Sequence, residues 1–397
     1  MFPRPRFNRM ELAGSLGDLG TLLPIAMAMI LINGLSPSGL FFTVGIFYLA
    51  SGLFAGVTTP VQPMKVIGAY AVATAMEPSQ IQASSLLMGI FLLAVALTGT
   101  IDFIGKYTPK STIRGVQLST GILLISGGIK FILGTSAFQT MEGAAEPFLH
   151  VQSLGPIPLG ICLGTTACIL ILFLLENKRF PAGLMVILGG LGTGLFMGKT
   201  LPMEMPGIHL PPFLPFGLPP KADLTFALFV LVLPQLPMTM GNAVLAYTDL
   251  SHQYFGEKAH RLSNKNVCIS MALANFLSFC FGGMPLCHGA GGLAAHHRFG
   301  ARTAGSNLMI GGIFIALVLF LGNDIIKALK LIPMAVLGAL LIFAGAQLAL
   351  TIMDLKTRKE YFVATLIIGI TLAANLAAGF MVGLITAHLL KWKKLSI

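Results

Sequence analysis

Two segments of the sequence, residues 57–76 and 283–300, place proline, glycine and hydrogen-bonding side chains inside otherwise apolar stretches. Each begins with residues that favour an extended backbone and continues with residues that favour a helix. Pro63 suits the first turn of such a helix, because its missing N–H leaves no bond unmade there. The free N–H groups of a first turn lie at the positive end of the helix dipole and can bind an anion. The two segments therefore predict an anion site built from two helix N-termini.

The side chains around these N-termini extend the predicted site. It comprises Gln62, Pro63, Met64 and Lys65 in the first segment, and Cys287, His288, Gly289, Gly291 and Gly292 in the second. The three glycines let a ligand approach the backbone closely. Lys65 is a charge inside an apolar stretch and is a functional candidate by default, although it can instead reach the interface or pair with a carboxylate. His288 can donate to an oxyanion or serve a structural role.

Two further apolar stretches carry polar groups beside glycine and proline. The first contains Asp18 and Thr21, and the second contains Gln235, Thr239 and Asn242. Neutral donors can hold an oxyanion without full neutralisation, although each can equally hydrogen-bond to a neighbouring helix. A bare carboxylate would repel an anion. We therefore interpret Asp18 as a proton acceptor used in coupling or as the partner of Lys65, with a role in shaping the glycine-rich turn as the alternative.

The composition identifies the elements that must position these residues. Of the 397 residues, 55% are hydrophobic and 10% charged, whereas soluble domains carry about 25% charged residues. An all-α polytopic membrane protein is the class that fits. Stretches of about 17–25 apolar residues can cross a bilayer, and ordinary candidates lie near 11–33, 38–56, 80–104, 112–133, 157–175, 180–198, 223–247, 264–282, 303–322, 329–350, 360–376 and 377–391. With the two interrupted segments, we expect about 14 transmembrane segments.

The basic residues test this count. With fourteen crossings and the N-terminus inside, all but six of the 25 Lys and Arg residues fall on the cytoplasmic side, where such residues accumulate. The net charge of +11 therefore reflects loop position and does not indicate nucleic-acid binding. Omitting either interrupted segment would reverse every basic loop between them. We expect both termini in the cytoplasm and a multi-pass protein of the plasma or inner membrane.

The two interrupted segments are the third and the tenth, which are equivalent places if the chain is two copies of seven spans. An odd number of spans inverts the second copy, and paired broken helices at corresponding positions indicate a transporter's substrate site. We expect a first repeat over residues 1–198, an outer loop over 199–221 and a second repeat over 222–397.

The motifs PVQPMK and MPLCHGAGGLAAHHRFGARTAG, together with GDLGTLLP in the first span, resemble the signatures of the molybdate transporter family, which is related to the sulfate permeases. The resemblance covers essentially the whole chain. It implies a 7+7 inverted repeat divided into core and gate domains, an elevator-like movement of the core, and a homodimer. Sulfate permeases usually add a C-terminal cytoplasmic domain, which we do not expect here, and this favours the molybdate branch.

We therefore expect proton-coupled secondary transport of molybdate or a related oxyanion, without a cofactor or a metal. No P-loop motif that would indicate ATP coupling is present. Sulfate transport by the same fold is the main alternative. A nucleobase carrier is disfavoured because the eighth span has amides but no acid, and a passive anion channel would ignore a proton gradient. A membrane-embedded enzyme would have to use Cys287 and His288 with His296 and His297, which we place toward the cytoplasmic end.

Overall fold

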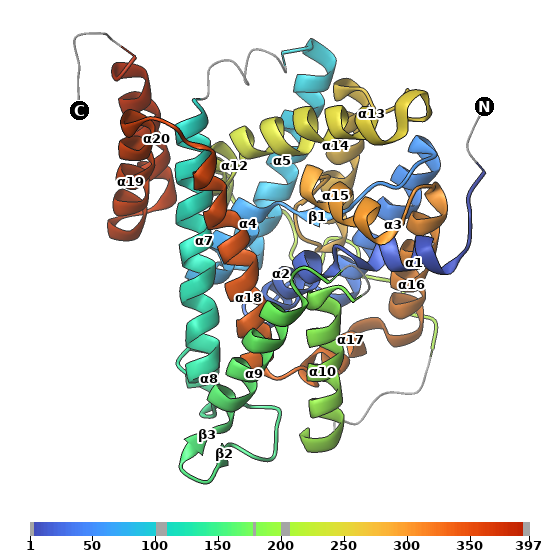
Figure 1. Cartoon of the computed structure of the whole chain (residues 1–397), viewed down its shortest axis with the longest axis vertical. Coiled ribbons are helices and arrows are strands. Elements are labelled where there is room, and N and C mark those ends of the chain that lie inside the picture. Colours follow the sequence, from blue (N-terminus) through green and yellow to red (C-terminus); the bar gives the residue numbers. More distant parts are fainter. Residues whose placement is uncertain (1–3, 101–108, 178–179, 200–206, 392–397) are drawn as a thin grey trace.

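The computed structural model describes residues 4–100, 109–177, 180–199 and 207–391, and it is mainly helical (Figure 1). Within these ranges, six helices are long and apolar enough to cross a membrane, or seven if a bent pair near the N-terminus counts as one span. Shorter apolar helices cover Lys65–Thr74, Leu159–Leu174, Ala182–Met197 and Leu376–Leu389. The expected class, a mostly helical membrane protein, is confirmed. Residues 200–206 of the predicted outer loop lie outside the described residues.

The larger group of helices, here called the central bundle, holds the two interrupted segments. It contains α1 (Arg9–Leu16), α2 (Leu19–Leu31), α3 (Pro37–Ala55), α4 (Lys65–Thr74), α5 (Pro78–Thr98), the run from α11 (Lys221–Phe226) to α13 (Tyr247–Phe255), α14 (Asn264–Phe281), α15 (Ala290–Phe299) and α16 (Ala304–Leu321). α3 packs along α16, and α5 packs along α14. A Cβ on Gly311 would lie 2.9 Å from the carbonyl oxygen of Gly45, so small residues allow the first pair its close approach.

The second group, here called the flanking bundle, contains α7 (Lys110–Leu133), α9 (Leu159–Leu174), α10 (Ala182–Met197), α18 (Met334–Ala349), α19 (Arg358–Ala373) and α20 (Leu376–Leu389). α7 and α18 meet at two pairs of glycines. A Cβ on Gly128 would lie 2.4 Å from the oxygen of Gly338, and one on Gly345 would lie 2.5 Å from that of Gly121. In Figure 1, α7 and α18 stand between the outer helices α19 and α20 and the central bundle, which they reach through α4 and α2.

The first predicted span, 11–33, is a bent pair of helices and not an unbroken rod. α1 and α2 meet at an angle of 47°, with Gly17 and Asp18 between them. Glycine is a poor helix former, so a break at Gly17 is favoured. The position of α1 is also fixed by hydrogen bonds to another helix. The carboxylate of Glu11 accepts hydrogen bonds from the backbone N–H and the hydroxyl of Thr303, at 3.0 and 2.9 Å. This contact holds α1 beside α16 and places Asp18 in the break.

The eighth predicted span, 223–247, belongs to a continuous helical run over Lys221–Ala259. Wide π turns at η1 (Ala227–Val232) and η2 (Thr239–Ala246) flank α12 (Leu233–Met238). Pro234 and Pro237 lie in α12 and have no N–H to donate, so the hydrogen-bond register shifts around them. This irregular run carries the amide and hydroxyl side chains that the sequence assigns to the site.

Outside the spanning helices, the loop after α8 (Ala137–Glu142) forms a small hairpin of β2 (Ser153–Leu154) and β3 (Ile157–Pro158). Glu146 fixes this loop to the flanking bundle. Its buried carboxylate accepts hydrogen bonds from the backbone N–H groups of Met334 and Ala335, at 2.7 and 2.9 Å. These are first-turn donors of α18, which no helical carbonyl can satisfy.

This contact predicts a pH-dependent stability. Burial raises the pKa of Glu146 from 4.5 to about 7, and the two N–H donors oppose that rise. A group whose pKa rises on folding stabilises the native state at low pH and loses that contribution as pH passes its folded pKa. We therefore expect the unfolding temperature of the purified protein to fall between about pH 4.5, the pKa of this carboxyl group in the unfolded chain, and about pH 7, its folded pKa. Glu146→Gln should flatten this profile, and the exposed control Glu257→Gln should not; equal profiles for the two variants would contradict the assignment.

Candidate functional site

The two interrupted segments meet near the centre of the molecule (Figure 1). β1 (Gln62–Pro63) pairs antiparallel with β4 (Leu286–Cys287), and both strands are buried. The N–H of Met64 adds a bond of 2.9 Å to the oxygen of Pro285. α4 begins at Lys65 and α15 at Ala290, so each half-helix starts directly beside this short ladder. The extended stretch followed by a helix, expected in both segments, is present in both.

Side-chain amides from neighbouring helices hold the extended backbone in place. Asn307 on α16 accepts from the N–H of Thr59 at 2.9 Å and donates to its oxygen at 2.7 Å. Gln82 on α5 donates to the oxygen of Gly283 at 2.7 Å, and Asn275 on α14 donates to that of Leu286 at 2.8 Å. Extended backbone in apolar surroundings requires such partners. These three amides are not among the predicted site residues, although an amide on an apolar helix is a signal that the sequence offers.

The N-terminus of α4 is capped by a residue that the sequence assigns to the ligand. The side-chain oxygen of Gln235 accepts from the N–H groups of Val66 and Ile67, at 3.0 and 3.3 Å. The side-chain nitrogen of Gln235 donates to the hydroxyl of Thr239 at 2.9 Å. Gln235 therefore makes the interhelical bond that was the alternative interpretation for it, whereas Thr239 is bonded to Gln235 within the same helical run. The first-turn donors of α4 are largely occupied.

Gln62 is likewise engaged within the protein. Its amide nitrogen donates to both carboxylate oxygens of Asp18, at 2.8 and 2.7 Å, in a buried pair. Its amide oxygen is buried and has no hydrogen-bond partner among the described residues. An acceptor cannot bind an anion directly, so Gln62 serves to tie the first half-helix to the break in the first span.

The N-terminus of α15 is the more open of the two. A Cβ on Gly289 would lie 2.1 Å from the side-chain oxygen of Gln62, and one on Gly292 would lie 2.5 Å from a carboxylate oxygen of Asp18. These two glycines are therefore needed for close packing. Gly291, by contrast, has no atom within 4 Å of its Cβ position, and it faces open space.

Two neighbouring cavities adjoin the half-helices. The smaller has a volume of about 10 Å³, which is room for about one water molecule. The larger has a volume of about 280 Å³ and lies between the central and the flanking bundle. Lys65, Met238 and Asn242 line both, so the cavities are adjacent. Only the larger one has room for a tetrahedral oxyanion.

The cavities divide the predicted site residues into three sets. Those that line the larger cavity are Thr21, Lys65, Asn242 and Gly291. Those that line only the smaller one are Gln62, Gln235, Thr239 and Cys287. Those that line neither are Asp18, Pro63, Met64, His288, Gly289 and Gly292. The ammonium of Lys65 makes no hydrogen bond or ion pair with the part of the chain that the structure describes, and Asp18 is close enough to interact with its charge.

His288 is buried away from both cavities. Its Nδ1 is 2.8 Å from the carbonyl oxygen of Pro60, and its Nε2 is 3.1 Å from the hydroxyl of Ser270. Because the carbonyl can only accept, Nδ1 carries the proton and Nε2 accepts from the serine. Both ring nitrogens are thus occupied, which favours the structural role that the sequence left open.

The two adjacent histidines of α15, expected toward the cytoplasmic end, have different surroundings. His296 is fully buried, with Nδ1 at 2.9 Å from the hydroxyl of Thr58 and its ring stacked on Tyr48. His297 remains partly exposed and stacks on Tyr254.

A known protein family and several known proteins are similar to this chain. The family described as molybdate transporter of the MFS superfamily matches residues 10–124 and 227–348, more than half of the chain. The chain is 30% identical to Molybdate transporter 2 of Arabidopsis thaliana, over 97% of its own length and 88% of that protein's. It is 28% identical to Molybdate transporter 1 of the same plant, over 94% and 86%.

Solved structures share the fold. The transmembrane domain of a cyanobacterium bicarbonate transporter, BicA, aligns with a TM-score of 0.63 at 17% identity, covering 98% of this chain and 100% of that one. The murine Slc26a9 anion transporter in the inward-facing state aligns with a TM-score of 0.67 at 15% identity, covering 97% and 68%. The path of the backbone is therefore shared far beyond the sequence motifs.

Proposed function

The chain belongs to the molybdate transporter family, and we propose that it carries molybdate across the membrane as a secondary active transporter. It is a transporter and not an enzyme. The observation that carries the proposal is the larger cavity, which brings the ammonium of Lys65 together with Asn242 and the open first turn of α15 at Gly291. A cation, an amide and a helix N-terminus together suit an oxyanion.

Sulfate remains the second candidate substrate. Sulfate and molybdate are both tetrahedral dianions, and the larger anion needs only a slightly roomier pocket. The cavity of about 280 Å³ has room for either anion. The curated relatives that match over most of their length carry the name molybdate transporter, which supports molybdate as the first candidate.

We also propose fourteen spans in two inverted repeats, over residues 1–198 and 222–397 with the outer loop 199–221 between them. Helix packing supports this. In the two proposed repeats, α3 corresponds to α14, α5 to α16, α7 to α18 and β1 to β4. A symmetric arrangement requires that α3 contact α16 if α14 contacts α5, and both pairs are in contact. The corresponding elements α7 and α18 also contact each other, as do β1 and β4. The backbone supports match as well, because Asn307 on the eleventh span holds Thr59 and Gln82 on the fourth holds Gly283.

The central and flanking bundles would act as the core and gate domains of an elevator-like movement. The predicted ligand side chains lie on the central bundle, and the larger cavity lies at its border with the flanking bundle. Movement of one bundle past the other would carry that cavity from one side of the membrane to the other. The distribution of basic residues supports cytoplasmic termini. We place the protein in a plasma or inner membrane, and the family resemblance implies a homodimer.

Protons are our proposed coupling ion, with Asp18 as the acceptor. Asp18 is buried in the break between α1 and α2, bonded to Gln62 and within electrostatic reach of Lys65. Protonation would neutralise this carboxylate and so change the charge near Lys65 and the bound anion. Uptake that ignores an imposed proton gradient would reject the coupling and favour a passive channel.

The deciding experiment is uptake by the purified protein in proteoliposomes. We expect saturable molybdate uptake that is inhibited by tungstate, more weakly by sulfate, and not by uracil, and that is accelerated when the outside is acidic. Inhibition by sulfate at lower concentrations than by molybdate itself would transfer the assignment to sulfate. Absence of any oxyanion uptake would reject the proposed function.

A further inference from the structure

The larger cavity has a second wall, which belongs to the flanking bundle. Arg114 and Gln117 on α7 and Thr351 after α18 line it, opposite Lys65 and Gly291. Two cationic side chains, from different bundles, therefore face one cavity, and none of its lining residues is an aspartate or glutamate. Like charges across a small cavity repel unless an anion lies between them.

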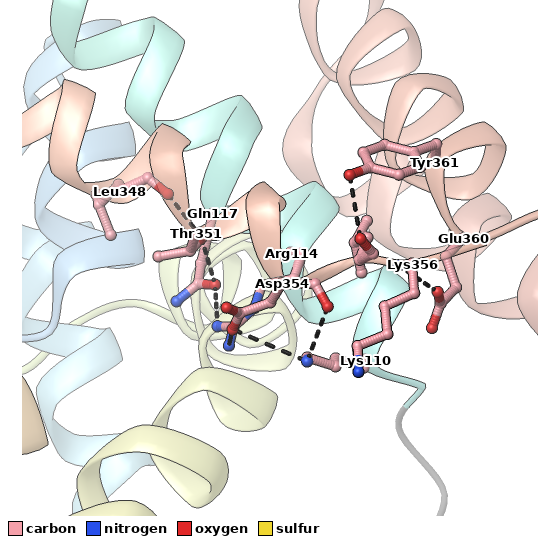
Figure 2. A network of polar contacts seen from close by, with 10 residues as sticks. Lys110, Arg114, Gln117, Leu348, Thr351, Asp354, Lys356, Glu360 and Tyr361 are labelled. Atoms are coloured by element: carbon pink, nitrogen blue, oxygen red, sulfur yellow. Dashed lines mark hydrogen bonds and ion pairs between the residues drawn. The ribbon is translucent and has the colours of Figure 1, made fainter. Parts of the chain in front are cut away.

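Contacts with its neighbours hold Arg114 in position (Figure 2). Its Nη1 donates to the side-chain oxygen of Gln117 at 2.7 Å, and that oxygen also accepts from the hydroxyl of Thr351 at 2.9 Å. Its Nη2 is paired with Asp354 at the end of η5 (Leu350–Asp354). Its Nε is buried and has no partner among the described residues. The side chain of Arg114 is 21% exposed and that of Asp354 is 50% exposed, so the carboxylate lies on the outer, solvated side.

We propose that Arg114 is a second anion-binding residue of the transport path, placed on the flanking bundle to receive the oxyanion that leaves Lys65. This inference rests on the proposed function. A guanidinium offers several N–H groups in a plane and suits oxyanions especially well. In the absence of the anion Asp354 satisfies part of that fork, and the anion replaces Asp354 when it moves across the cavity. Two sites of moderate strength in series allow an ion both to enter and to leave.

Lys110 provides the matched comparison. Its ammonium is 3.9 Å from the same carboxylate of Asp354 and donates to the backbone oxygen of that residue at 3.0 Å. Lys110 does not line the larger cavity. A purely structural role of the ion pair would therefore involve Lys110 and Arg114 alike, whereas a role in anion transfer involves Arg114 alone.

The test compares Arg114→Gln, Arg114→Lys and Lys110→Gln with the wild type in proteoliposomes. Maximal molybdate uptake, and equilibrium molybdate binding to the detergent-solubilised protein, are both measured. We expect Arg114→Gln to lower maximal uptake about 10-fold while equilibrium binding changes by less than about 3-fold, because Lys65 still holds the anion. Arg114→Lys should recover part of the rate, and Lys110→Gln should stay within about 2-fold of the wild type.

Wild-type uptake by Arg114→Gln, or an equal loss in Lys110→Gln, would overturn the inference and leave the proposed function intact. A loss of equilibrium binding in Arg114→Gln as large as the loss of uptake would also overturn it, because the anion would then have one shared site. Failure of the wild type to bind or transport any oxyanion would instead reject the proposed function itself.

Discussion

Replacing Lys65 by glutamine should weaken molybdate binding about 10- to 100-fold, which corresponds to the loss of a charge-assisted hydrogen bond of about 1.5–3 kcal/mol. Lys65 is half-buried, lines both cavities, and is held by no hydrogen bond or ion pair in the described part of the chain. Its removal therefore deletes charge from the cavity without breaking a contact of the fold. The measurement is equilibrium binding of labelled molybdate to the purified protein, with uptake in proteoliposomes beside it.

The matched control is Lys130→Gln, which removes a lysine from the exposed end of α7. We expect Lys130→Gln to bind molybdate like the wild type, and Lys65→Arg to keep part of the affinity because the charge remains. The unfolding temperature of Lys65→Gln should stay near that of the wild type. Unchanged affinity in Lys65→Gln would show that the larger cavity is not where the anion binds.

The half-helices were predictable from the sequence because proline and glycine act locally. Pro63 fixes its own φ angle and the glycines at 289, 291 and 292 are poor helix formers that permit close approach, so both helix starts could be placed within a few residues. The family resemblance, which rests on the same motifs, is confirmed by the family match and the curated relatives. Each predicted span also overlaps a helix of the structure, because apolar length alone marks such helices.

The partners of polar side chains were not predictable, because they depend on packing between distant segments. The sequence predicts Gln235 and Gln62 as ligands; in the structure Gln235 caps α4 and Gln62 binds Asp18. An amide beside glycine and proline looks the same in a sequence whether it faces a ligand or a helix end. Arg114 illustrates the converse. The sequence shows it only as one of 25 basic residues, and its place opposite Lys65 follows from the packing of α4 against α7.

The second large effect concerns the glycine that seats the second half-helix. Gly292→Ala would place a Cβ 2.5 Å from Asp18 Oδ2, 2.7 Å from Gln62 Nε2 and 2.8 Å from Pro60 Cβ. None of these atoms can move away easily. Asp18 and Gln62 are hydrogen-bonded to each other, and Pro60 is a buried proline whose ring is closed onto its own backbone. Overpacking of this kind costs about 1–3 kcal/mol. We expect a lower unfolding temperature and uptake reduced at least about 10-fold, since α15 must shift away from the site.

The variant Gly291→Ala separates the packing effect from the binding effect, because residue 291 is next to residue 292 on the same turn of α15. Its added Cβ meets no atom within 4 Å, and alanine favours a helix over glycine by about 1 kcal/mol, so the unfolding temperature should not fall. The same methyl group enters the larger cavity, where it narrows the approach to the open N–H groups, so molybdate affinity should decrease. If Gly292→Ala were as stable and as active as the wild type, close packing of α15 against Asp18 and Gln62 would not be required for transport. The anion site would then depend on Gly291 and not on that packing.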